Sequence, residues 1–409
     1  MKMYDVSFPN VRQMNQELVQ KTMDRRRMLK LFGSAGLAVA GVAAVAGTTK
    51  AASVVNAAEL AARYHQEDQA ALAPGPREDG TNLWKVLVGG MDMETAIEYH
   101  GFFPGEITVN AGDSIWFAYD MPMFHTVTFP VAGEMPALMI PDPEITRPAA
   151  DAPPKLIYNP VLMFGAGGDV VDGTQLVSSS ADVFRDPTAP LVFTFSTPGT
   201  YDYVCMPHAS VMQGRVVVQD AGSALPQDQA ELDAVAAEQI AVLHADGLFQ
   251  IEQYSTPVQT AKHDGSSLWE VVVGAGGASQ VRVQRFLPGD LTITAGDSVK
   301  FINRAEGEPH TVTFLGTGEE APLDVIEETF ADGSPKLVQN MEAFLPSGGN
   351  VWTGAGFVSS GFMGIPQLGL PMEFEVLFDT PGEYIYYCIL HGDNTGGRMA
   401  AKLTVNAAE

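Results

Sequence analysis

The segment that decides the fold occurs twice in this chain of 409 residues. PGTYDYVCMPHASVMQGRVVV occupies residues 198–218, and PGEYIYYCILHGDNTGGRMAAKLTV occupies residues 381–405. Each copy begins at a Pro-Gly turn, alternates tyrosine with other residues, reaches a cysteine that a histidine follows three positions later, and ends in a strand-like run. Two such runs around a turn predict a pair of β-strands. We therefore expect the same strand pair to close each half of the chain.

The duplication extends upstream of these closing segments. Three shorter segments recur in the same order, and they are DGTNLWKVLVG (79–89) with DGSSLWEVVVG (264–274), FPGEITVNAGDS (103–114) with LPGDLTITAGDS (287–298), and HTVTF (125–129) with HTVTF (310–314). Self-similarity of this kind is the sequence signature of repeated structural units. The length also suits more than one domain. Two domains of one fold are expected.

Both copies are rich in turn residues and in short β-branched or aromatic runs. In the first copy these runs predict strands at residues 107–110, 114–118, 126–129, 191–196 and 215–219. A long stretch rich in Pro and Gly follows HTVTF in each copy, and we expect it to form an elaborated loop over one end of a sandwich. The predicted class is all-β, with two tandem β-sandwiches that carry long loop insertions.

Segments rich in Ala, Glu and Gln, with apolar residues at helical spacing, precede each copy and predict short linker helices at residues 51–73 and 227–246. The expected organisation is an N-terminal segment at 1–46, a helical linker at 47–78, a first domain at 79–220, a second helical linker at 221–263 and a second domain at 264–409.

The N-terminal segment carries features of an export signal. DRRRMLK at residues 24–30 closely resembles the twin-arginine export motif, and an uncharged apolar stretch follows at residues 31–46. Because this stretch is shorter than the ~20 residues of a full membrane span, cleavage and retention as an anchor both stay open. We predict export by the twin-arginine route to the periplasm or the outer face of the cytoplasmic membrane. Contact with the membrane is expected only through an uncleaved anchor.

Charge and cysteine content exclude several classes of protein. The chain has 49 acidic and 23 basic residues, a formal net charge of −26, which repels phosphate backbones and excludes nucleic acid as a partner. Two cysteines are too few for a disulfide scaffold, an iron–sulfur ferredoxin or a four-cysteine zinc site. The two occupy equivalent positions in separate repeats, so a disulfide between them is not expected.

The first closing segment places three metal-binding side chains close together in the sequence. Cys205, His208 and Met212 offer a thiolate, an imidazole and a thioether, and His125 at the start of an earlier predicted strand supplies a second imidazole. A soft thiolate and two imidazoles with a weak thioether accept both Cu(I) and Cu(II). Zinc seldom takes a methionine ligand. This set therefore predicts copper.

The second copy offers His310, Cys388 and His391 at matching positions. Its axial ligand depends on the alignment. Matching the Gly-Arg dipeptides places Thr395 opposite the methionine of the first copy, whereas matching the terminal strands places Met399 there. The second alignment keeps the strand alternation and puts the insertion in a loop, where insertions cost little. We favour Met399, with Thr395 or no axial ligand as alternatives.

These segments resemble the cupredoxins, the blue-copper family of plastocyanin and azurin. PGxYxYxCxxH followed by a methionine is similar to the copper signature of that family, and PGxxTxxAGDS to its earlier strand pair. The resemblance implies a Greek-key sandwich in each domain with a type 1 copper at one end. The implied ligands are His125, Cys205, His208 and Met212 in the first domain, and His310, Cys388, His391 and Met399 in the second. The His-to-Met spacings differ from that of plastocyanin.

Two mononuclear copper centres predict an electron carrier, not an enzyme, with no catalytic residues. Its donor and acceptor are expected to be redox proteins, such as a cytochrome or a membrane-bound oxidoreductase. The alternatives are a copper oxidoreductase of the nitrite reductase or multicopper oxidase kind, and a protein of copper storage or delivery. The oxidoreductases need a further copper bound by His-x-His pairs or by a histidine directly before the cysteine, and the sequence has neither. The other histidines are expected to be ordinary packing or solvent residues, and they are His65, His100, His244 and His263.

Overall fold

The computed structural model describes residues 72–119, 124–131, 135–145, 155–181, 190–277, 279–393 and 398–408. The expected export segment, its anchor and almost all of the expected first linker helix lie outside this part of the chain. Within it, no helix combines the length and the apolar character that crossing a membrane requires.

The first half of the described chain folds into two sheets that enclose one core. One sheet has the order β1-β2-β7-β14-β12, with β5 beside β2, and the other has the order β11-β13-β8-β15-β16-β6. The bounds are β1 Gly75–Pro76, β2 Asn82–Val88, β5 Phe102–Phe103, β6 Glu106–Asn110, β7 Ser114–Tyr119, β8 Thr128–Phe129, β11 Phe164–Ala166, β12 Val170–Val171, β13 Val177–Ser180, β14 Leu191–Phe195, β15 Gly199–Val204 and β16 Gln213–Gln219.

The second half forms a matching pair of sheets. The order β25-β27-β21-β18-β19 continues into β4 and β3 of the first half, with β17 beside β18, and faces the order β20-β29-β28-β22-β26. The bounds are β3 Met91–Asp92, β4 Ile97–Tyr99, β17 Val258–Ala261, β18 Ser267–Ala275, β19 Val281–Leu287, β20 Leu291–Thr294, β21 Ser298–Arg304, β22 Thr313–Leu315, β25 Val351–Trp352, β26 Phe357–Ser359, β27 Glu373–Phe378, β28 Gly382–Gly392 and β29 Arg398–Asn406.

The two halves pair their strands in the same way. In the first half β2 lies parallel to β7, and β6 lies parallel to β16. The equivalent parallel pairs in the second half are β18 with β21 and β20 with β29. The closing segments form antiparallel pairs, β15 with β16 and β28 with β29. The predicted all-β class is confirmed. All five strands predicted in the first copy are present, although the one expected at residues 126–129 begins only at Thr128.

A buried aspartate explains why two of the repeated motifs recur together. Asp113, of the AGDS motif, accepts hydrogen bonds from the backbone N–H of Asn82 at 2.7 Å and from Trp84 Nε1 at 2.9 Å. In the second half Asp297 accepts from Trp269 Nε1 at 3.0 Å. A buried carboxylate needs such donors, so the aspartate fixes the start of one strand against the next. The aspartate therefore has a structural role in both halves.

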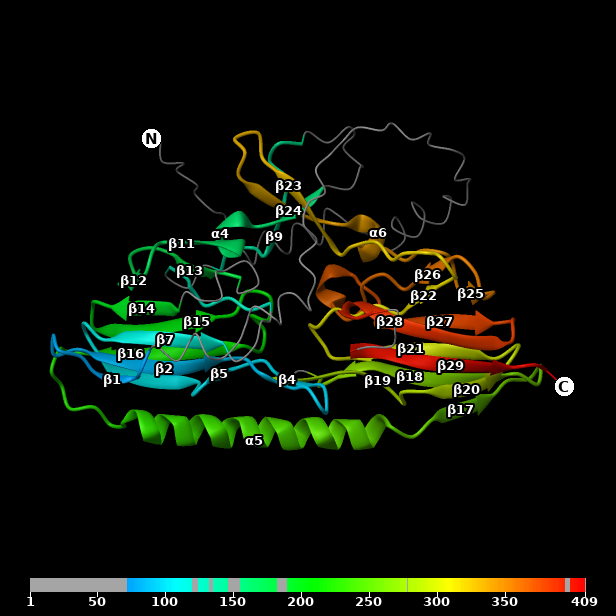
Figure 1. The fold of residues 1–409 in the computed structure, drawn as a ribbon, viewed down its shortest axis with the longest axis horizontal. Helices are drawn as coiled ribbons and strands as arrows, with labels where there is room; N and C mark the ends of the chain where they lie inside the picture. The colour runs from blue at the N-terminus through cyan, green and yellow to red at the C-terminus, as the bar shows by residue number, and fades with distance from the viewer. Residues whose placement is uncertain are drawn as a thin grey trace.

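A long helix joins the two sandwiches along one side (Figure 1). α5 spans Gln229–Tyr254, which is longer than the helix expected at residues 227–246, and it packs against strands of both halves. Asp228 caps its start by a reciprocal capping box with Glu231. The remaining described helices are single turns in the long loops, and they are α4 Pro160–Met163, α6 Met341–Phe344 and η3 Pro366–Leu368.

Two further connections hold the halves together. β4 of the first half pairs antiparallel with β19 of the second. On the side opposite α5, the long loops of the two halves share a sheet of order β23-β24-β10-β9 (Figure 1). The bounds are β9 Met139–Pro141, β10 Leu156–Tyr158, β23 Val325–Thr329 and β24 Pro335–Gln339. The loops expected over one end of each sandwich therefore bridge the two sandwiches, because strand edges in one loop are completed by the other.

Candidate metal centres

Three of the predicted ligands of the first half meet at one end of its sandwich. His125 lies just before β8, Cys205 just after β15, and His208 in the turn that leads to β16. His125 Nδ1 lies 3.1 Å from His208 Nδ1, and Cys205 Sγ lies 3.5 Å from each of these two nitrogens. His125 and Cys205 are fully buried. The strand ends thus bring together residues that are some 80 positions apart in the chain.

Backbone groups hold this arrangement in place. The N–H of Thr126 donates to Cys205 Sγ at 3.4 Å, and the N–H of Met206 donates to Thr126 Oγ1 at 2.9 Å. Gly89 has φ +65°, and a Cβ there would lie 2.4 Å from His125 Nε2. The glycine therefore lets the backbone approach the imidazole closely. The repeated glycine at the end of β2 has a role in positioning a candidate ligand.

The second half repeats the same arrangement. His310 Nδ1 lies 3.1 Å from His391 Nδ1, and Cys388 Sγ lies 3.9 Å and 3.5 Å from these nitrogens respectively. The N–H of Thr311 donates to Cys388 Sγ at 3.3 Å. A Cβ on Gly274 would lie 2.2 Å from His310 Nε2. Cys205 and Cys388, both described and both buried, are not joined by a disulfide.

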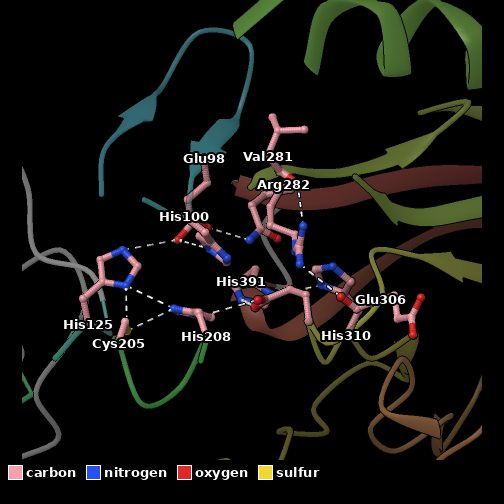
Figure 2. A network of polar contacts seen from close by, with 12 residues as sticks. Glu98, His100, His125, Cys205, His208, Val281, Arg282, Glu306, His310 and His391 are labelled. Atoms are coloured by element: carbon pink, nitrogen blue, oxygen red, sulfur yellow. Dashed lines mark hydrogen bonds and ion pairs between the residues drawn. The ribbon is translucent and has the colours of Figure 1, made fainter. Parts of the chain in front are cut away.

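The donor set fits a metal ion bound by three protein atoms in a plane. Bonds of about 2.0 Å to nitrogen and 2.3 Å to sulfur, at trigonal angles, separate the donor atoms by roughly 3 to 4 Å. All the separations in both triads fall within this range. Two imidazoles and one thiolate are the trigonal ligands of blue copper. The residues present therefore fit copper, and Figure 2 shows the first triad converging.

The two predicted axial methionines occupy the same place in the strand pairing. The last pair before the first site is Val204 with Gln213, which leaves Cys205 opposite Met212 at the next position. The last regular pair before the second site is Tyr387 with Ala400, which leaves Cys388 opposite Met399. Both methionines are buried in the core of their own half. Thr395 lies outside the described residues, so the choice between it and Met399 stays a prediction.

The two sites differ in their electrostatics in the metal-free protein. Burial and the neighbouring His100 hold the pKa of His208 well below its usual value. Burial also acts to lower the pKa of His391, but Cys388 and Glu308 outweigh it and raise this pKa to about 10. Burial alone would raise the pKa of the Cys388 thiol, yet contact with His391 lowers it. The second site therefore favours a thiolate, which is the form that binds a metal.

A polar cluster that the sequence did not indicate lies between the two triads. His100 is buried, and its Nε2 lies 2.9 Å from Glu98 Oε1 while its ring stacks on His208 at 3.9 Å between centroids. Gln284 Nε2 donates to Glu98 Oε2 at 2.7 Å. Burial would raise the pKa of Glu98, but His100 outweighs it and holds this pKa well below its usual value. His100 thus belongs to the site region, contrary to the expectation of an ordinary packing residue.

The other three histidines of that expectation have different outcomes. His244 lies on α5, where its Nδ1 is 2.9 Å from Tyr99 Oη, and His263 is exposed in a loop, so these two are packing and solvent residues as expected. His65 lies outside the described residues. One signal for the missed cluster was present in the sequence. Aligned on the shared Pro-Gly, Glu98 and Arg282 hold equivalent places in the two repeats with opposite charges, and β4 and β19 pair them directly.

Comparison with known proteins supports the copper family. Residues 90–219 match the copper binding proteins of the plastocyanin/azurin family, so the expected cupredoxin resemblance is confirmed over that stretch. No curated protein matches the chain.

Solved structures of cupredoxins are also similar to parts of this chain. Oxidised plastocyanin from Dryopteris crassirhizoma shares 20% identity with a TM-score of 0.19, over 34% of this chain and 99% of that one. A pseudoazurin from Sinorhizobium meliltoi shares 17% with a TM-score of 0.19, over 38% and 95%. A Cu(I) form of an amicyanin mutant shares 20% with a TM-score of 0.20, over 37% and 88%.

Proposed function

We propose that this protein is an exported electron carrier with two mononuclear type 1 copper sites, one in each half. The observation that supports it best is the pair of His-Cys-His triads, which lie at equivalent strand ends with donor separations suited to a trigonal metal. The ligands are His125, Cys205, His208 and Met212 in one site, and His310, Cys388, His391 and Met399 in the other. Bound copper supplies a one-electron couple between Cu(I) and Cu(II).

The chain contributes rigidity and a dry environment. Buried donors held by the Thr126 and Thr311 N–H groups and by the close approach of Gly89 and Gly274 have little freedom to move. A site that changes little between two oxidation states favours fast electron transfer. The backbone N–H groups also stabilise the thiolates. These features favour a carrier over storage or delivery, which needs release of the metal.

A copper oxidoreductase stays as the second candidate because of one specific cluster. His100, His208 and Glu308 each place a ligand atom within 4.8 Å of the others between the two triads. A third copper bound there would supply the open site that an enzyme requires. His208 already faces the first triad through Nδ1, which favours the carrier.

Export and partners follow from the sequence expectations. The twin-arginine-like segment supports delivery of the folded protein to the periplasm or to the outer face of the cytoplasmic membrane, where a retained segment would act as an anchor. A net charge of −26 favours a donor or acceptor protein with a basic surface, such as a cytochrome or a membrane-bound oxidoreductase.

Metal stoichiometry and spectroscopy test the carrier. The oxidised full-length protein is expected to hold two coppers per chain and to absorb intensely in red light. Its paramagnetic-resonance spectrum should contain two signals with narrow hyperfine splitting. Cys205→Ser and Cys388→Ser should each remove one copper and one signal, since each removes the only thiolate of its site. A third copper with a normal hyperfine pattern would favour the oxidoreductase, and a zinc-bound protein would refute a redox role.

The reduction potential of the second site identifies its axial ligand. Met399→Leu removes an electron donor that stabilises Cu(II), so the reduction potential of that site should rise while its copper is retained. Thr395→Val is the matched control and should leave the potential unchanged. The opposite pattern would establish Thr395 as the axial residue.

A further inference from the structure

We propose that Glu308 couples the two copper centres into one redox unit, by bridging His208 and His391 on the path of internal electron transfer. This inference rests on the proposed function and adds a route that the separate sites do not imply. His208 and His391 approach each other from the two halves of the molecule (Figure 2).

The carboxylate of Glu308 lies between these two imidazoles. Its Oε1 is 3.2 Å from His391 Nε2, and its Oε2 is 3.5 Å from His208 Nε2. The Glu308 side chain is 5% exposed, against 11% for His208 and 21% for His391. Each oxygen therefore faces a different metal centre, and little water reaches the space between them.

The chemistry of the imidazoles explains this placement. In both triads Nδ1 faces the cysteine sulfur, so Nε2 is the nitrogen left for a second partner. A metal-bound histidine usually donates its other N–H to a carboxylate or a carbonyl, which orients the ring. A buried carboxylate in turn needs donors to offset its lost hydration. One carboxylate here lies at ion-pair distance from two histidines of different halves, 3.2 Å from His391 and 3.5 Å from His208.

The backbone holds Glu308 in this position. The Glu308 N–H donates to the Ala305 carbonyl at 3.0 Å, and Asn303 Nδ2 donates to the Glu308 carbonyl at 3.0 Å. Glu308 also lies two residues before His310, so one short loop carries both the bridge and a ligand. The pairing of β4 with β19 fixes the opposite half next to this loop. Electron transfer between the histidines therefore needs no movement of the domains.

With copper bound, one electron would pass from the reduced centre to the oxidised one, no bond would form or break, and each Nε2 would keep its proton. External partners then need access to only one of the two centres for both to be filled or emptied.

Internal electron transfer provides the test. The oxidised full-length protein is reduced by a substoichiometric pulse of radiolytic electrons, and redistribution between the sites is followed by freeze-quenched paramagnetic resonance. Glu308→Gln can accept from only one imidazole, and the internal rate should fall about 10-fold or more, in line with losses at other outer-shell partners of metal sites. Both copper signals and the two-copper stoichiometry should persist.

Glu306→Gln is the matched control, because it makes the same change of charge on an exposed residue of the same loop. It should leave the rate at the wild-type value. An unchanged rate in Glu308→Gln, or an equal fall in the control, would overturn the proposed route. Loss of a third metal ion on Glu308→Gln would also overturn it, since Glu308 would then be a ligand.

A second readout does not depend on copper. In the metal-free protein, nuclear magnetic resonance should show that the Nε2–H groups of His208 and His391 are both protected from exchange with water. In the Glu308→Gln variant at least one of these two groups should exchange faster. If the wild-type protein binds no copper but this protection is present, the placement of Glu308 between the two histidines is supported and the electron-carrier function is refuted. If copper is present but the protection is not, the bridge fails alone.

Discussion

At the scale of single residues, glycines shape the candidate sites as much as the ligands do. Gly89 and Gly274 end equivalent strands with φ +65° and +69°, and both lie directly against the imidazole of the buried histidine. A side chain at either place meets two separate costs, one from the left-handed backbone and one from the ring. The first cost is about 1 to 2 kcal/mol for an L-residue.

Gly274→Ala should therefore destabilise the metal-free protein by more than the backbone cost alone. Overpacking against the His310 ring adds about 1 to 3 kcal/mol. Gly265→Ala is the control, since Gly265 has φ +88° and nothing within 4 Å of an added Cβ. Urea unfolding of both variants measures the difference. Equal losses in the two would show that the ring of His310 gives way freely.

At the scale of elements, α5 is one of three connections that the described residues make between the sandwiches. Its buried residues are Leu232, Ala236 and Gly247, and the helix packs on strands from both halves. Gly247 is costly in the interior of a helix, by about 1 kcal/mol relative to Ala. Its presence is explained by β4, because an added Cβ would lie 2.7 Å from the Ile97 side chain.

Gly247→Val should force α5 away from β4 and lower the melting temperature. We expect a loss of about 1 to 3 kcal/mol from overpacking. Ala245→Val, on the exposed side of α5, carries the poor helix propensity of valine without the contact and should lose only a few tenths of a kcal/mol. Calorimetry compares the two. If Gly247→Val and Ala245→Val have the same melting temperature, the Ile97 side chain repacks without cost.

At the scale of the whole molecule, a buried ion cluster closes the shared sheet opposite α5. Lys336 Nζ lies 3.0 Å from Asp142 Oδ2 and 3.2 Å from Glu144 Oε2, which come from the other half of the chain. Burial acts to raise the pKa of Asp142, but the Glu144 N–H and Lys336 outweigh it and lower this pKa. A carboxyl with a depressed pKa stabilises the fold above its unfolded pKa and loses that contribution as the pH falls through the folded value.

Lys336→Met should accordingly cost about 3 to 5 kcal/mol at neutral pH, because it removes the cation that contacts the buried Asp142 carboxylate. The difference from the wild type should shrink below the ordinary aspartate pKa of 3.8, as Asp142 gains a proton. Lys402→Met removes the exposed pair with Glu383 and should change stability by at most about 1 kcal/mol. Urea titrations at several pH values test this. If the stability lost in Lys336→Met does not depend on pH, the loss comes from packing and not from the charge of Asp142.

The sequence by itself determined what depends on local pattern. Alternating runs between Gly and Pro turns gave the strands of the first half, because strand formation requires residues that suit a pleated, half-buried surface. Cys205, His208 and Met212 lie within eight consecutive residues, so their spacing predicted a common site. His125 and His310 were found because the repeat placed each before an equivalent strand.

Only the tertiary structure decided how the two halves meet. Glu98 and His100 lie in the first half of the chain and Glu308 in the second, and the sequence around them does not show that they meet. The shared sheet of the long loops and the pairing of β4 with β19 likewise join segments from different repeats. Such contacts depend on shape and charge across an interface, which no local pattern encodes. They alone placed His208 and His391 on either side of one carboxylate.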